Sequence, residues 1–231
     1  MISFFKIFLI VIDALILSSL TIITLPVNYK GKATHYITKL FARIILLVAG
    51  AKLEVVGREN LDENDKYIFI SNHLSYLDIP VIMQTVPNNV RFIYKKIISW
   101  VPIFGWAMYL NGYIPINRTN GREALQSLKN AAKKIKKGYS VAIFPEGTRS
   151  PDGKTGDFKK GIFVLASEAK EKIVPISIIG TNKILGKKSL KFRAGKVKVI
   201  IDKPIEFRND KNFLNEIREK IIANILNSKS S

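Results

Sequence analysis

The sequence predicts an α/β protein with a mixed, mostly parallel sheet flanked by helices, and a hydrophobic two-helix hairpin ahead of it. Two features of the chain predict this fold. After residue 50, short β-branched and aromatic runs alternate with stretches of helical periodicity. Before residue 50 there are two long apolar segments, the first of which ends at Pro26. We therefore expect an N-terminal helical hairpin over residues 1–50 and an α/β domain over residues 51–231.

The N-terminal segments have the composition of membrane-associated helices. Residues 2–25 are almost continuously apolar and long enough to span a bilayer. Asp13 is unfavourable inside a bilayer, so shallow insertion of a membrane hairpin into one leaflet is the alternative to a full span. Residues 33–51 have an apolar side and a polar stripe of His35, Lys39 and Arg43. This pattern is typical of an amphipathic helix against a lipid interface or against the domain.

Seven short strands and three helices are expected in the α/β domain. The strands cover residues 52–56, 67–70, 90–94, 112–116, 140–144, 173–179 and 197–201. The helices cover residues 120–137, 160–169 and 211–226. The first helix has the clearest ends, because Asn120 and Glu123 can cap its start and Gly138 can end it. In sheets of this kind, functional residues gather where strands end.

The first polar motif, residues 72–78 (NHLSYLD), follows a strand directly. His73 suits a general base because the ordinary pKa of histidine lies near neutral. A turn must bring Asp78 to it, and Ser75 could supply this turn by capping a helix in which Asp78 is the third residue. The alternative is that Asp78 only completes a capping box and His73 is a polar turn residue.

Further charged residues follow three other predicted strands. Residues 144–150 (FPEGTRS) put Glu146, Gly147 and Arg149 into one tight turn, and arginine suits bidentate binding of phosphate. Lys95 and Arg118 each lie just past a strand. Any of these could instead be an ordinary surface charge, but several cations at the strand ends of one sheet favour an anion site.

Composition limits the class of partner. The 231 residues include 37 Lys and Arg, 18 Asp and Glu and no cysteine, which gives a net charge of +19. The absence of cysteine excludes disulfides, thiolate zinc sites and a cysteine nucleophile. The positive charge favours nucleic acid, an acidic carrier protein, a phosphate substrate or an anionic membrane. Nucleic acid is disfavoured because the sequence has no recognition-helix or single-strand-binding signature.

Taken together, four segments resemble the sequence blocks of the 1-acylglycerol-3-phosphate acyltransferase family. They are NHLSYLD at 72–78, GYIPINR at 112–118, FPEGTRS at 144–150 and VPI at 174–176. The resemblance extends over residues 50–180 and the N-terminal hairpin, and implies that residues 51–231 form an acyltransferase catalytic domain. Pro115 departs from the aromatic or aliphatic residue usual in the family.

The resemblance implies a role for each residue. His73 would take the proton of the sn-2 hydroxyl of lysophosphatidate, and Asp78 would hold the imidazole. Lys96 is the alternative if Lys95 is the wrong lysine of the pair. The residues implied to bind the acceptor are Lys95, Arg118, Glu146, Gly147 and Arg149.

The implied reaction moves a fatty acyl group from acyl-CoA or acyl-carrier protein to lysophosphatidate, giving phosphatidate. A thioester is already activated, so no covalent acyl-enzyme, metal or cofactor is required. The expected location is an anionic membrane surface, on the cytoplasmic face of the inner or plasma membrane. Two alternatives remain: the same chemistry with another lysophospholipid, glycerol 3-phosphate or a non-phosphate lipid, and a non-catalytic basic protein that docks on membranes.

Overall fold

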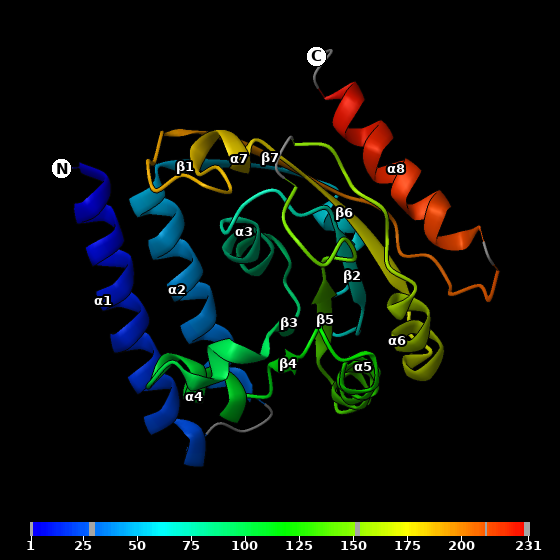
Figure 1. Cartoon of the computed structure of the whole chain (residues 1–231), viewed down its shortest axis with the longest axis horizontal. Helices are drawn as coiled ribbons and strands as arrows, with labels where there is room; N and C mark the ends of the chain where they lie inside the picture. The colour runs from blue at the N-terminus through cyan, green and yellow to red at the C-terminus, as the bar shows by residue number, and fades with distance from the viewer. Residues whose placement is uncertain (1, 28–30, 151–152, 211, 229–231) are drawn as a thin grey trace.

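A single seven-stranded sheet forms the centre of the molecule (Figure 1). The computed structural model describes residues 2–27, 31–150, 153–210 and 212–228. The strand order is β1-β7-β6-β2-β5-β3-β4, and every neighbouring pair is parallel except β6 with β7. The mixed, mostly parallel sheet predicted from the sequence is therefore confirmed. The strands are β1 (Ala51–Val56), β2 (Ile68–Ser71), β3 (Val90–Lys95), β4 (Ile114–Ile116), β5 (Ser140–Ile143), β6 (Ile173–Ile179) and β7 (Gly195–Ile201).

The helices include the expected ones and several short ones that the sequence pattern did not indicate. The main helices are α1 (Ile2–Ile23), α2 (Lys32–Ala49), α5 (Gly121–Lys136), α6 (Gly161–Ala169) and α8 (Phe213–Asn227). Asn120 caps α5 as predicted, because its side chain accepts a hydrogen bond from the Glu123 amide. Residue 211, where the last helix was expected to begin, lies outside the described residues. The helix expected to contain Asp78 is α3 (Asp78–Thr85). The additional segments are α4 (Phe104–Leu110), α7 (Thr181–Ile184), η1 (Leu25–Val27), η3 (Arg58–Asn60) and η4 (Lys96–Trp100).

Helices cover both faces of the sheet and enclose two hydrophobic cores. On one face, α2 and α3 contribute to a core with Phe69, Phe92 and Val174. On the other face, α5, α6 and α8 enclose a second core around Ile68 and Ile70. Successive residues of β2 thus point to opposite faces, as a strand buried on both sides requires.

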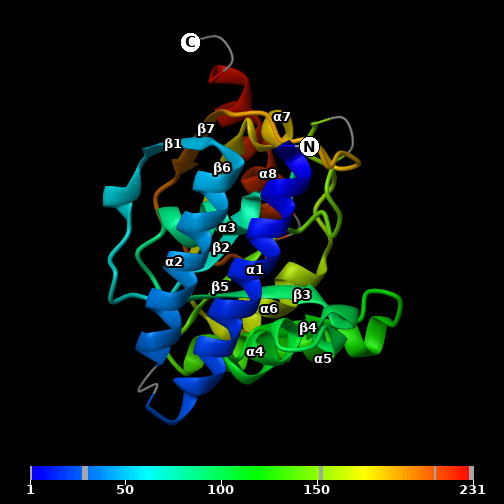
Figure 2. The same ribbon diagram turned by 90° about the vertical axis from the view of Figure 1, so that its left-hand side faces the viewer.

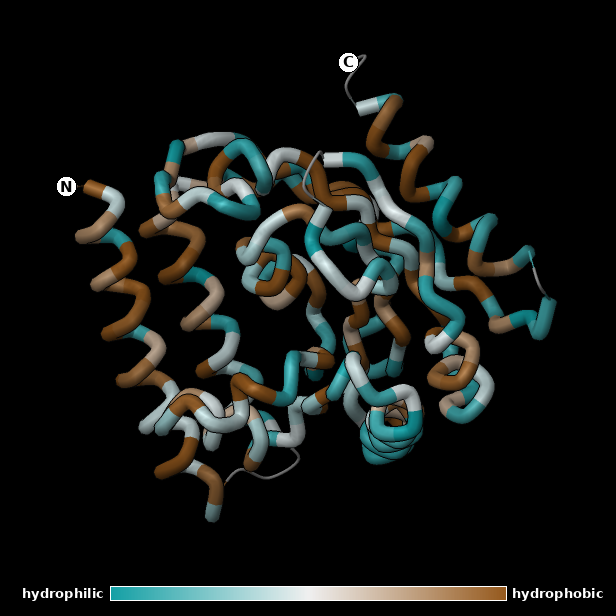
Figure 3. Tube along the Cα trace, in the orientation of Figure 1, coloured by the Kyte–Doolittle hydropathy of each residue, from teal (hydrophilic) through white to brown (hydrophobic). Residues whose placement is uncertain are grey.

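The two N-terminal helices pack side by side (Figures 1 and 2). One side of α2 is buried in the first core through Ala42, Ile45, Leu46 and Ala49, so this helix lies against the domain. Among the described residues, α1 is the one helix long and apolar enough to cross a membrane, judged by length and composition. Figure 3 shows hydrophobic residues along its whole length. Because α2 is also part of the domain core, a separate membrane hairpin over residues 1–50 stays a prediction.

The topology brings the polar motifs to one edge of the sheet. Strands β2, β5, β3 and β4 are neighbours and run parallel, so their carboxyl ends lie at the same edge. Each of these strands is followed by one of the polar motifs identified in the sequence. The sheet therefore collects in space residues that are far apart in the chain.

Gly57 closes β1 against β7 and allows a test of this packing. Its φ is +85°, and a Cβ at this position would lie 2.0 Å from the carbonyl oxygen of Ile201. We expect Gly57→Ala to lower the free energy of unfolding by more than about 2 kcal/mol, measured by denaturant titration. Gly121→Ala is the matched control, since Gly121 opens α5 and a Cβ added there would have no heavy atom within 4 Å. A Gly57→Ala protein as stable as the control would contradict the close approach.

Candidate active site

Asn72 fixes the segment that carries the histidine. It directly follows β2 and is fully buried. Its side-chain nitrogen donates to the carbonyl of Ile178 at 2.8 Å, and its side-chain oxygen accepts from the Ile178 amide at 2.8 Å. These two bonds extend the pairing of β2 with β6 by one residue. His73 therefore leaves the sheet at a defined point.

His73 and Asp78 form a buried hydrogen-bonded pair. The distance between His73 Nδ1 and Asp78 Oδ2 is 2.8 Å, with the imidazole 14% exposed and the carboxylate fully buried. Because the carboxylate accepts at Nδ1, the neutral imidazole carries its proton there and offers Nε2 as the basic nitrogen. Within the described residues, Nε2 has no hydrogen-bond partner.

Three further donors reach the Asp78 carboxylate. The amides of Leu74 and Ser75 donate to Oδ2 at 2.6 and 2.8 Å, and the Thr181 hydroxyl donates to Oδ1 at 2.6 Å. A buried carboxylate needs such compensation. The arrangement keeps its position independent of whether His73 is neutral or protonated.

Ser75 closes the turn ahead of α3 with the two reciprocal bonds of a capping box. Its hydroxyl accepts from the Leu77 amide at 3.2 Å, and the Asp78 carboxylate accepts from the Ser75 amide at 2.8 Å. The Ser75 hydroxyl also donates to the carbonyl of Leu185 at 2.7 Å. The helix begins at Asp78, so the expectation that Asp78 is its third residue is wrong.

The plane of the imidazole is set by an aromatic stack. The rings of His73 and Phe144 are 4.0 Å apart between centroids and nearly parallel, at 14°. Phe144 in turn stacks on Phe92 at 6.3 Å. The histidine therefore has one ring face covered and one edge bound to Asp78, which leaves little rotational freedom.

The turn after β5 is tied directly to His73. Glu146 accepts from the His73 amide at 2.8 Å through Oε1 and from the Gly156 amide at 2.9 Å through Oε2. Burial raises the pKa of the Glu146 carboxyl above its usual value, and the two amides act against this rise. Gly147 has a φ of +72°, where its backbone carbonyl accepts a hydrogen bond from Arg118.

The predicted cations lie at this turn and around it. The guanidinium carbon of Arg149 lies 3.5 Å from the ring centre of Tyr76, inside the histidine motif. Arg118 reaches the same turn through Gly147. Lys95 ends β3, and by strand alternation it points to the same face as Ile93. Lys96 instead pairs with Glu123 at 3.0 Å.

Three residues of the site were missed by the sequence reasoning. Thr181 donates a hydrogen bond to Asp78, and Tyr76 stacks under Arg149. The amine of Lys159 lies close to Gly147, because a Cβ added to Gly147 would be 3.0 Å from it. Tyr76 lies within the first motif and could have been noted as an aromatic partner. Thr181 and Lys159 have no local signal, because their contacts join segments that are distant in the chain.

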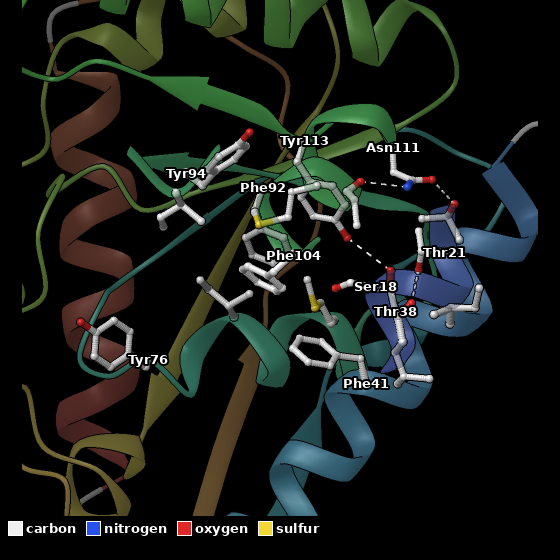
Figure 4. Close-up of a pocket in the computed structure, with 18 residues that line it drawn as sticks. Ser18, Thr21, Thr38, Phe41, Tyr76, Phe92, Tyr94, Phe104, Asn111 and Tyr113 are labelled. Atoms are coloured by element: carbon white, nitrogen blue, oxygen red, sulfur yellow. Dashed lines mark hydrogen bonds between the residues drawn. The ribbon is translucent and has the colours of Figure 1, made fainter. Parts of the chain in front are cut away.

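Two cavities reach the aromatic stack on which the histidine rests. The first has a volume of about 270 Å³ and is walled by α1, α2, α3, α4 and β3, with Tyr76 at one end (Figure 4). Its lining is mainly apolar, with hydroxyl and amide groups of Thr21, Thr38 and Asn111 gathered at one side. The second cavity, about 230 Å³, has Arg118 and Lys159 among apolar residues. Phe92 lines the first cavity and Phe144 the second.

A mixed α/β sheet with a histidine and an aspartate at its carboxyl edge, and cations around them, defines a class of protein that can activate a hydroxyl group. Within the described residues, no group of three or more His, Cys, Asp or Glu side chains could hold a metal ion. The chain belongs to the acyltransferase family, whose model matches residues 52–179. The family membership indicated by the sequence motifs is thus confirmed.

Curated relatives of this chain are named 1-acyl-sn-glycerol-3-phosphate acyltransferases. The chloroplastic 1-acyl-sn-glycerol-3-phosphate acyltransferase of Arabidopsis thaliana is 40% identical over 84% of this chain and 54% of its own length. The enzyme of the same name from Saccharomyces cerevisiae is 35% identical over 83% of this chain and 65% of its own. The chain thus spans between about half and two thirds of these relatives.

A solved structure has the same fold. The crystal structure of the 1-acyl-sn-glycerophosphate acyltransferase PlsC from Thermotoga maritima superimposes with a TM-score of 0.85. The alignment covers 100% of this chain and 97% of that one, at 24% identity. The likeness includes the N-terminal helices as well as the sheet.

The contact between Thr181 and Asp78 can be tested by an isosteric change. We expect Thr181→Val to lower the free energy of unfolding by about 1–3 kcal/mol, because Asp78 Oδ1 stays buried without its donor. Thr181→Ser keeps the hydroxyl and should recover most of this loss. Equal stability of the Val and Ser variants, measured by chemical denaturation, would show that the hydroxyl is not needed.

Proposed function

We propose that the protein transfers a fatty acyl group from acyl-CoA or acyl-carrier protein to the sn-2 hydroxyl of 1-acylglycerol 3-phosphate, giving phosphatidate. The observation that carries this proposal is the His73–Asp78 pair, whose Nε2 is left open, together with Arg118 at Gly147 and Arg149 at Tyr76. The names of the curated relatives support the same acceptor.

The chemistry follows from the position of the free nitrogen. His73 Nε2 accepts the proton of the acceptor hydroxyl as its oxygen attacks the thioester carbonyl carbon. The carbon–sulfur bond then breaks, and the imidazolium returns the proton to the leaving thiolate. Asp78 keeps Nδ1 protonated and stabilises the transient positive charge of the ring.

Cations around the turn suit the acceptor's phosphate. Arg149 stacks on Tyr76 and donates through Nη1 to the carbonyl of Lys187 at 3.4 Å. We propose that its remaining N–H groups bind the phosphate oxygens. Arg118 and Lys159 line the second cavity, and we propose Lys95 as a further contact from the end of β3. A phosphate bound by these groups would hold the hydroxyl near His73.

Glu146 and Gly147 have a positioning task in this proposal. Both carboxylate oxygens of Glu146 already accept backbone amides, one of them that of His73. The residue therefore couples the histidine to the phosphate-binding turn while facing the glycerol part of the acceptor. Gly147 keeps the turn close to Lys159, because a side chain there would meet the amine.

We assign the fatty acyl chain to the first cavity. Its walls are mainly apolar, and Tyr76 and Phe92 link it to the histidine through the Phe144 stack. A lipid acceptor also implies work at a membrane, and α1 has the length and composition to anchor there. We propose the cytoplasmic face of the inner or plasma membrane as the location, where both thioester donors are found.

Replacing the proposed base tests the mechanism. We expect His73→Ala to lower kcat by about 10²–10⁴-fold with lysophosphatidate and either donor, because the variant lacks the nitrogen that would accept the proton. The folded state of the variant is checked by its thermal unfolding and circular dichroism. Full activity in a folded variant would exclude the general-base role.

The same assay separates the alternatives. Activity with glycerol 3-phosphate or another lysophospholipid, and none with lysophosphatidate, would change the acceptor and keep the mechanism. Absence of acyl transfer to any acceptor would leave the non-catalytic membrane-binding protein as the interpretation.

The role of Arg149 is tested through the two Michaelis constants. We expect Arg149→Ala to raise the KM of lysophosphatidate by about 10–100-fold, as for a lost charge-assisted hydrogen bond, and to change the donor KM little. Arg208→Ala is the matched control, because that arginine pairs with Glu216 on α8 and should leave both constants unchanged. Equal increases for acceptor and donor would contradict phosphate binding by Arg149.

A further inference from the structure

A group of large apolar and aromatic side chains is exposed on η4, α4 and the turn between them. We call it the aromatic platform. Trp100 is 77% exposed and Trp106 is 52% exposed, although residues of this size are usually highly buried. The platform consists of Ile97, Trp100, Val101, Trp106, Tyr109 and Leu110.

The platform is the outer side of a helix whose inner side is already used. Phe104, Ala107 and Met108 of α4 line the first cavity, while Trp106, Tyr109 and Leu110 point away from it. The helix is thus apolar on both sides. A helix that is apolar on both sides is normally buried on both sides, so the exposed outer side of α4 indicates a binding surface.

The platform is held rigidly in its exposed position. Gly105 packs α4 onto η4 so closely that a Cβ there would lie 2.2 Å from the carbonyl oxygen of Ile98. The Gly105 amide donates to the carbonyl of Val101 at 2.8 Å. Ile103, between the two segments, has a φ of 63°, which is unfavourable for a β-branched residue. A strained and tightly packed display of aromatic residues indicates a binding surface.

We propose that the aromatic platform inserts into the interfacial layer of an anionic lipid bilayer. Tryptophan and tyrosine favour this layer, because the ring is apolar and one end can form hydrogen bonds with water or headgroups. The net charge of +19 attracts the chain to a bilayer that carries acidic headgroups. Exposed aromatic rings and positive charge are the two components of an interfacial membrane contact.

The neighbouring helix supports a lipid partner. Both views show α4 beside the C-terminal half of α1, and the two helices pack together (Figures 1 and 2). That half of α1 exposes a further row of apolar side chains, namely Leu15, Ile16, Leu20 and Ile23. A second copy of the chain is a poorer occupant, because two molecules with a net charge of +19 repel each other.

The inference is independent of the proposed reaction, because its test needs no substrate. Trp100 and Trp106 are the two tryptophans of the sequence, so intrinsic fluorescence reports on the platform alone. The full chain is reconstituted into vesicles of phosphatidylcholine and phosphatidylglycerol, with and without lipids brominated along the acyl chains. Trp100→Phe and Trp106→Phe variants assign the signal to each ring.

A matched control places a tryptophan on another exposed site. Leu226, on α8, is 56% exposed and lies on the far side of the sheet from α4. Leu226→Trp is introduced into a protein that carries both Trp→Phe changes. Its fluorescence should be quenched by aqueous acrylamide and not by brominated lipid.

We expect the platform tryptophans to show the opposite behaviour. Brominated lipid should quench both of them several-fold more than the control, and acrylamide several-fold less. Quenching equal to that of the Leu226→Trp control would overturn the proposal. A second outcome would also overturn the proposal. If acrylamide quenching fell as the protein concentration rose, while brominated lipid still did not quench the tryptophans, a second copy of the chain would be covering the platform.

Discussion

The buried carboxylate of Asp78 is the constraint on which the rest of the site depends. A negative charge without solvent access is stable only where donors surround it, and here they come from two parts of the chain. The turn after β2 supplies two amides and the ring nitrogen of His73, and the segment after β6 supplies Thr181. These parts meet because β2 and β6 are paired in the sheet. The geometry of the His73–Asp78 pair therefore depends on the strand order of the sheet.

Glu146 repeats this principle on the other side of β2. Glu146 follows β5, the strand that pairs with β2 on the side opposite β6. Its carboxylate accepts from the backbone amide of His73, and the carboxylate of Asp78 binds the ring of the same residue. His73 is thus held by its backbone from one side and by its ring from the other. Two acidic residues orient one histidine, and neither has to leave its hydrogen bonds to do so.

Much of the architecture could be predicted from the sequence because it depends on local patterns. The β-branched runs indicated every strand, and Asn120 with Glu123 indicated the start of α5. The motif residues were found because each follows a strand. The short helix α4 was not found, since a segment that is apolar on both sides lacks the periodicity that marks a helix. The role of Thr181 could not be found either, because it depends on a contact between the segments that follow β6 and β2. The role of Lys159 depends on how the connection after β5 folds back onto Gly147.

Phe144 has a consequence for how the activity of this chain can change. Its ring forms part of the second cavity, stacks on the imidazole and touches Phe92, which belongs to the first cavity. One side chain therefore lies between two compartments and also forms the surface on which the His73 ring rests. A change in the size of either compartment that moves this ring also tilts His73. In the proposed reaction, substrate preference and turnover are for this reason linked, and selection on one of them acts on both.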